Sequence, residues 1–99
     1  MSGIVWLLEK NKDIVKPAII NFLRRRKEDL RRMLSDVEQK LSEFREKYGD
    51  FREFESTLPN DFNSHEVWFE WKELIRMREE ILRELEEIDR AIKEITQRV

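Results

Sequence analysis

The chain contains no cysteine, which excludes disulfides and thiolate metal sites and fits a reducing cytoplasm. It has only two glycines and two prolines in 99 residues, whereas sheets and sandwiches need a turn residue every ten or so positions. No apolar run approaches the ~20 residues of a membrane span. The longest, residues 4–8, lacks the basic flank and cleavage site of a signal peptide. We therefore expect an all-α protein that is cytoplasmic and makes no membrane contact.

The residues that are present favour long helices. Charged residues make up 42% of the chain and hydrophobic residues 39%, a mixture typical of long helices and coiled coils. The length corresponds to a single domain. Two helices of this size bury only a narrow seam between them, so we expect the chain to self-associate, as a homodimer that forms a four-helix assembly.

The first long helix is predicted over residues 17–48, after an N-terminal apolar arm or short helix over residues 1–16. Pro17 suits the first turn of a helix, although a continuous helix kinked at this proline is the alternative. Gly49 lies where a C-capping glycine belongs. Between them, apolar residues recur in two heptad rows, the pattern of a seam between two helices. The rows are Ile20, Lys27, Leu34, Leu41 and Tyr48, and Leu23, Leu30, Val37 and Phe44.

A second long helix is predicted over residues 64–98. Asn63 or Ser64 would cap it, with Glu66 completing a capping box. Its heptad rows are Val67, Leu74, Ile81, Ile88 and Ile95, and Trp71, Arg78, Leu85, Ile92 and Val99. The connection over residues 49–63 carries four apolar residues that a solvated linker would lack, so we expect it to fold back onto the hairpin tip. They are Phe51, Phe54, Leu58 and Phe62.

The two helices are expected to form a long antiparallel hairpin, because so short a connection allows them to bury their seams only in that orientation. Residues 1–49 carry a net charge of +4 and residues 50–99 a net charge of −6. Folding near residue 57 sets the basic run of residues 24–32 beside the acidic residues 79–89. The charge asymmetry thus predicts complementary pairing that fixes the register of the hairpin.

Two apolar regions lie outside the seam and are the predicted partner-binding surfaces. Trp68 and Phe69 follow Val67 on other faces of the second helix, where the connection either covers them or leaves an exposed apolar patch. The N-terminal strip raises the same possibility at the far end of the hairpin. The residues proposed to contact a protein partner are Val5, Trp6, Leu8, Trp68 and Phe69.

The basic run is an alternative functional site. Arg24, Arg25 and Arg31 could contact the phosphate backbone of a nucleic acid. The competing interpretation is that acidic side chains of the second helix neutralise them. No aromatic residues interleave with the run to stack on bases, and the net charge of the chain is −2. Nucleic-acid binding is therefore the less favoured reading.

Catalytic and metal-binding patterns are weak. The only histidine, His65, lies near Asp61 and Glu70, but one imidazole among many acids is weak grounds for a metal site. Lys27 and Arg78 interrupt the seam. They could line the shared cavity of a small helical enzyme with a dimeric site, fix the register of the seam, or reach outward to solvent. No nucleophile triad, phosphate-binding loop or cofactor motif is present. We expect a non-enzymatic protein without a cofactor.

Residues 45–75 carry a family resemblance. The stretches are Lys47-Tyr48-Gly49, Phe51-x-x-Phe54-Glu55-x-x-Leu58 and Ser64-His65-Glu66-Val67-Trp68-Phe69-Glu70-Trp71-Lys72-x-Leu74. Together they resemble a group of small archaeal and bacterial helical proteins regarded as antitoxin-like partners in toxin–antitoxin modules. This chain departs from the family pattern in having only Asp50 between Gly49 and Phe51. The resemblance implies a helical scaffold that occludes a toxin, with no catalytic residue of its own.

Overall fold

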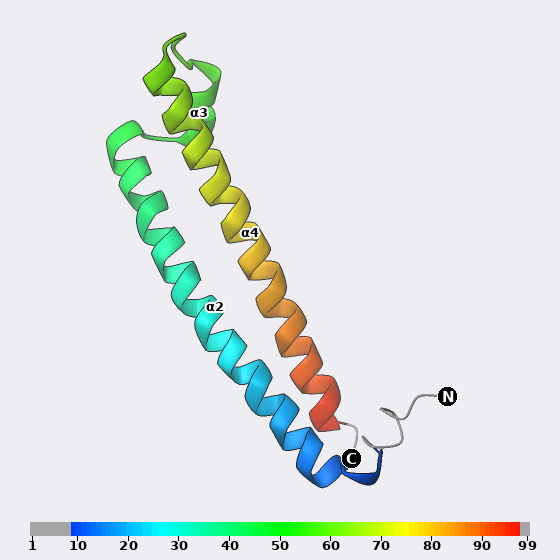
Figure 1. Ribbon diagram of the computed structural model, residues 1–99. Helices are drawn as coiled ribbons and strands as arrows, with labels where there is room; N and C mark the ends of the chain where they lie inside the picture. The colour runs from blue at the N-terminus through cyan, green and yellow to red at the C-terminus, as the bar shows by residue number, and fades with distance from the viewer. Residues whose placement is uncertain (1–8, 98–99) are drawn as a thin grey trace.

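The computed structural model describes residues 9–97, and within them every regular element is helical. Helix α2 spans Lys12–Tyr48, the short helix α3 spans Phe51–Ser56, and helix α4 spans Phe62–Gln97. The two long helices lie side by side and run antiparallel, with α3 beside the hairpin tip (Figure 1). The body measures 62 × 27 × 17 Å. The predicted all-α hairpin is therefore confirmed.

The core is one file of side chains along the seam, as the heptads predicted. Each buried residue belongs to one of the four predicted rows. Because only two helices contribute, the other seam positions stay half-buried at the edges of this file. The buried residues are Leu30, Val37, Leu41, Trp71, Leu74, Ile81 and Ile88.

Helix α2 begins at Lys12, so the predicted start at Pro17 is wrong by five residues. Residues 9–10 are helical too, and a turn at Asn11 separates them from α2, so the continuous-helix alternative is also wrong. Asn11 precedes the first turn, and its carbonyl accepts hydrogen bonds from the N–H groups of Ile14 (2.9 Å) and Val15 (2.8 Å). Pro17 is the sixth helical residue, so its missing N–H removes only the bond that would reach Asp13.

Gly49 ends helix α2 at the predicted position. Its N–H donates to the carbonyl of Arg45 (2.9 Å), and its backbone has φ +83° and ψ −143°. This conformation is not the left-handed helical one of a common C-cap, but it also has a positive φ that side chains with a Cβ rarely adopt. The glycine turns the chain out of α2 and directly into α3.

The cap of helix α4 is Asp61, which corrects the prediction of Asn63 or Ser64. One carboxylate oxygen of Asp61 accepts from the backbone N–H of Ser64 (2.8 Å), and the other accepts from the Ser64 hydroxyl (2.9 Å). The hydrogen bond from the Ser64 backbone is the main cause that lowers the pKa of Asp61 below its usual 3.8. The helix consequently starts two residues before the predicted Ser64.

This cap predicts a pH dependence. Because the pKa of Asp61 is lower in the folded chain, its stabilising effect is present above the unfolded pKa near 3.8 and is lost as the pH falls through the lowered folded value. Asp61→Asn keeps a good N-cap but cannot titrate. The stability advantage of the wild type over this variant should therefore shrink below about pH 3.8. Urea titrations at pH 6 and pH 2.5 measure it; a difference that does not vary with pH would contradict this role.

Candidate functional site

An aromatic cluster closes the hairpin tip. Trp71 is 1% exposed, and four rings surround it, from both neighbouring helices. Phe44 stacks on it with a centroid separation of 5.5 Å, and Phe51 meets it edge-on at 5.1 Å. Tyr48 and Phe54 lie at 6.2 and 5.5 Å. Phe44 and Trp71 both belong to predicted seam rows, and the connection folds back through Phe51 and Phe54 as expected.

Trp68 lies at the side of the tip that α3 covers. Its Nε1–H donates to a carboxylate oxygen of Glu55 at 2.9 Å, and the Lys72 ammonium lies 4.8 Å from its ring centroid. The side chain is half-buried. Its polar edge and one face are thus occupied by contacts within the chain. Of the two candidate tip residues, Trp68 is the one that the connection covers.

Phe69 has the opposite environment. It is 61% exposed, and Phe62, one heptad earlier, is 78% exposed. Residues seven apart lie on one face of a helix, and this row is turned away from the seam. A shallow surface groove lies between the two rings. Its other lining residues are half-buried Val67 and the polar residues Asn63, His65, Glu66 and Glu70. The tip therefore presents a small apolar surface with an acidic border.

The exposure of Phe62 corrects the expectation that all four apolar residues of the connection pack on the tip. Phe51 and Phe54 join the Trp71 cluster, and Leu58 is half-buried. Phe62 is instead the first residue of α4, on the outer row of that helix. The predicted helix start at residue 64 hid this relation. Counting the heptad back from Phe69 would have found it.

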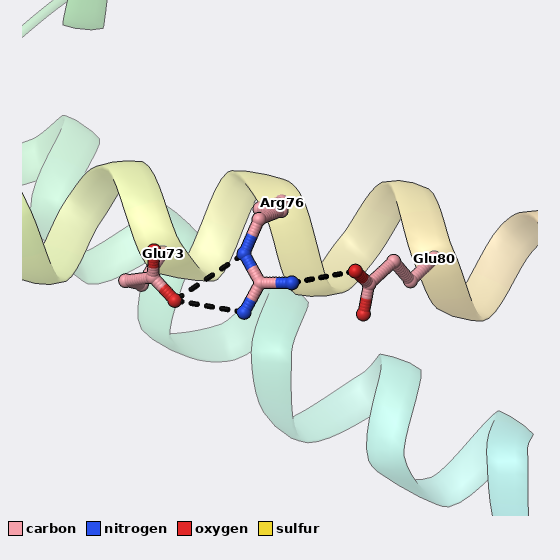
Figure 2. Close-up of polar contacts among 3 residues, drawn as sticks. All are labelled: Glu73, Arg76 and Glu80. Carbon is pink, nitrogen blue, oxygen red and sulfur yellow. Dashed lines mark hydrogen bonds and ion pairs between the residues drawn. The ribbon is translucent and has the colours of Figure 1, made fainter.

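The same outer row is charged, not apolar, one heptad further along α4. Arg76 follows Phe69 by seven residues and reaches two carboxylates along α4, Glu73 at 2.8 Å and Glu80 (Figure 2). Hydrogen bonding to Arg76 is the main cause that lowers the pKa of Glu73. These charges satisfy one another within the helix. The apolar part of the outer row is therefore confined to the tip.

The basic run is only partly neutralised. Arg26 contacts Glu84 through two hydrogen bonds of 2.7 and 3.2 Å, Lys27 pairs with Asp89, and Arg32 pairs with Asp29. Within residues 9–97, no ion pair involves the three residues proposed for nucleic-acid binding, and all three are exposed. These are Arg24, Arg25 and Arg31.

The seam charges do not form a shared site within one chain. Arg78 lies in a surface groove with Trp71 and donates to Glu38 at 3.1 Å. Lys27 pairs instead with Asp89, eleven residues along α4 from Arg78 and so roughly 16 Å away. Both cations reach across to the opposite helix at the edge of the seam. This is the pairing expected of seam charges that fix the register of the two helices, and it is not a reach outward to solvent.

The other sequence candidates have no assembled site. The Asp61 carboxylate is engaged in the helix cap, and the His65 ring faces Trp68 at 6.5 Å. In the part of the chain that the structure describes, no three acids, histidines or cysteines could jointly hold a metal ion, and no helix is long and apolar enough to cross a bilayer. The proposed contacts at Val5, Trp6 and Leu8 lie outside the described residues.

Comparisons with protein-family models, with curated proteins and with solved structures find no match to this chain. The antitoxin-like resemblance of residues 45–75 therefore stays a prediction.

Proposed function

We propose that this chain is a non-enzymatic helical interaction module that self-associates and binds a partner protein through Phe62 and Phe69. The exposure of these two aromatic rings carries the proposal, because large aromatic side chains are the commonest anchors of protein interfaces. Binding through these rings loses little backbone conformational entropy, because the helix that carries them is already ordered. We place this activity in the cytoplasm.

The acidic border narrows the class of partner. Glu66 and Glu70 edge the aromatic groove, so the complementary surface is an apolar pocket with lysine or arginine at its rim. Antitoxin-like proteins of the kind that residues 45–75 resemble act by covering a toxin. A toxin with a basic, nucleic-acid-binding cleft would fit this surface, and the hairpin would inhibit it by occlusion.

The test is co-expression of the tagged chain with the product of each adjacent gene, followed by calorimetry on any complex that copurifies. We expect one of these products to arrest growth alone and to be neutralised by this chain. Phe62→Ser and Phe69→Ser should each weaken the complex roughly 30-fold or more, the effect of losing an interface anchor. Because both rings are exposed, far-UV circular dichroism should not change.

The matched control is Ile14→Ser, since Ile14 is 73% exposed but lies on α2, at the other end of the hairpin. It should leave the affinity unchanged. Wild-type affinity in the Phe62 and Phe69 double variant would contradict the proposal. So would a chain that binds no protein but shifts DNA or RNA in a salt-sensitive manner, with the shift abolished by glutamate at Arg24, Arg25 and Arg31. That result would favour the nucleic-acid alternative.

A further inference from the structure

One broad face of the hairpin carries most of its exposed apolar side chains. Seven large apolar residues are exposed within residues 9–97, and four of them lie on this face, here called the methionine face. Met33 of α2 and Met77 of α4 line one shallow groove together with the Arg26–Glu84 pair. Ile19 lies one heptad before Arg26 and two heptads before Met33, so these three residues share one row of α2. Phe22 belongs to the neighbouring row of the helix surface.

The opposite face lacks such a surface on α2. Its corresponding row, in the same heptad register, is Arg24, Arg31, Glu38 and Arg45. On the methionine face, Met33 is 42% exposed, Met77 37% and Phe22 69%. Exposed apolar side chains gathered on one face mark an interface. The Arg26–Glu84 pair lies between Phe22 and Met33 on this face, and each of its charges already has its partner.

The charges of the two helices identify the occupant. Helix α2 carries 11 basic and 7 acidic side chains, and α4 carries 6 and 10, so their net charges are +4 and −4. A second copy can stack α2 on the α4 of its partner, or α2 on α2. Only the first arrangement places helices of opposite net charge on each other, whereas like-charged helices repel. The attraction lies in the half away from the tip, where residues 12–32 of α2 carry a net +5 and residues 78–97 of α4 a net −3.

We infer that the methionine face binds a second copy of this chain, with the twofold axis parallel to the hairpin and α2 of each copy on α4 of the other. Met33 of one copy then lies level with Met77 of its partner, because the two residues are level within one hairpin. Lys40 faces the partner's Glu70, since these two residues line one groove in the monomer. The result is a four-helix bundle with both tips at the same end.

The dimensions suit a stable dimer. The hairpin is 62 Å long and up to 27 Å wide, so one face can bury the ~800 Å² per partner of a standard interface. Stacking this face leaves Phe62 and Phe69 uncovered, because their row is turned away from the seam, not toward the methionine face. The inference rests on the proposed self-association and specifies its face and orientation. Glu70 is shared between this face and the tip groove, whereas the two aromatic rings that anchor the partner protein belong to the tip alone.

Oligomeric state tests the face. Sedimentation equilibrium of the full chain should show a dimer, and Phe22→Glu or Met33→Glu should raise its dissociation constant roughly 30-fold or more. Ile14→Glu is the control, because it adds the same charge to another exposed apolar residue of α2, outside the methionine face. A monomer at 100 µM would overturn both the self-association and this face. A dimer whose dissociation constant is unchanged by Phe22→Glu and by Met33→Glu would contradict only the assignment of the interface to the methionine face.

Disulfide crosslinking tests the orientation, and the absence of native cysteine makes every engineered thiol unique. Met33→Cys and Met77→Cys chains, one of them tagged, are mixed and oxidised. The mixed disulfide should form at several times the yield of either homodimer. Predominant Met33→Cys homodimers would show α2 stacked on α2 and overturn the assignment. Phe69→Ser added to both chains should leave the yields unchanged, which separates this interface from the tip.

Discussion

Replacing Trp71 with alanine is expected to lower the free energy of unfolding by about 3–5 kcal/mol, the usual cost of removing a buried aromatic side chain. Trp71 is 1% exposed and contacts rings from both α2 and α3. Its loss leaves a cavity where three helices meet, and Phe51 and Phe54 then have no core to hold α3. The whole free energy of unfolding of a native domain is only about 5–15 kcal/mol, so the tip should open in this variant.

Urea denaturation followed by circular dichroism at 222 nm measures this loss. The matched control is Trp68→Phe, three residues earlier on the same helix, which removes the hydrogen bond to Glu55 but keeps most of the packing. Its cost should be about 1 kcal/mol. Equal effects from the two substitutions would show that Trp71 does not hold the tip together.

Leu30→Ala should be the second most damaging substitution, with a cost of about 2–5 kcal/mol. Leu30 is also 1% exposed and lies midway along α2, where only two helices enclose it. The thin hairpin has little other material that could collapse into the space. The loss should therefore lie toward the upper end of that range, and it should leave the aromatic tip intact.

The same urea titration, read by tryptophan fluorescence as well as circular dichroism, separates the two cases. Ser35→Ala is the control, because Ser35 is an exposed residue of the same helix and should change stability by less than about 0.5 kcal/mol. A cost below about 1 kcal/mol for Leu30→Ala would mean that the middle of the hairpin is not well packed.

The hairpin could be predicted from the sequence because heptad spacing is a property of the chain itself. Every buried residue belongs to a predicted row, and Gly49 marks the end of α2. The two helix starts were less predictable. Pro17 occurs at the sixth position of α2, although proline is more common at the first position of a helix. Asp61, Asn63 and Ser64 are all residue types that favour an N-cap, so residue type alone does not choose between them.

The tip surface was predicted less well, because exposure there depends on tertiary contacts. Trp68 and Phe69 are adjacent and similar in hydrophobicity, yet Glu55 reaches only Trp68. Which of the two is covered follows from the position of α3, and that position follows from the backbone at Gly49. The methionine face had the same difficulty, because an exposed methionine is not distinctive until Met33 and Met77 are seen to share one groove.

The aromatic cluster also lies where contacting residues of the two long helices are separated by the fewest residues along the chain. Phe44 and Trp71 are 27 residues apart, whereas Lys27 and Asp89 are 62 apart. Loop closure is therefore less costly at the tip, by about 0.7 kcal/mol for these two pairs. The largest rings of the core thus meet at the least entropic cost, and each seam layer below can then form against the one above it. We therefore expect folding to proceed from the tip toward the two ends of the chain, with the same short loop ordering the surface that carries Phe62 and Phe69.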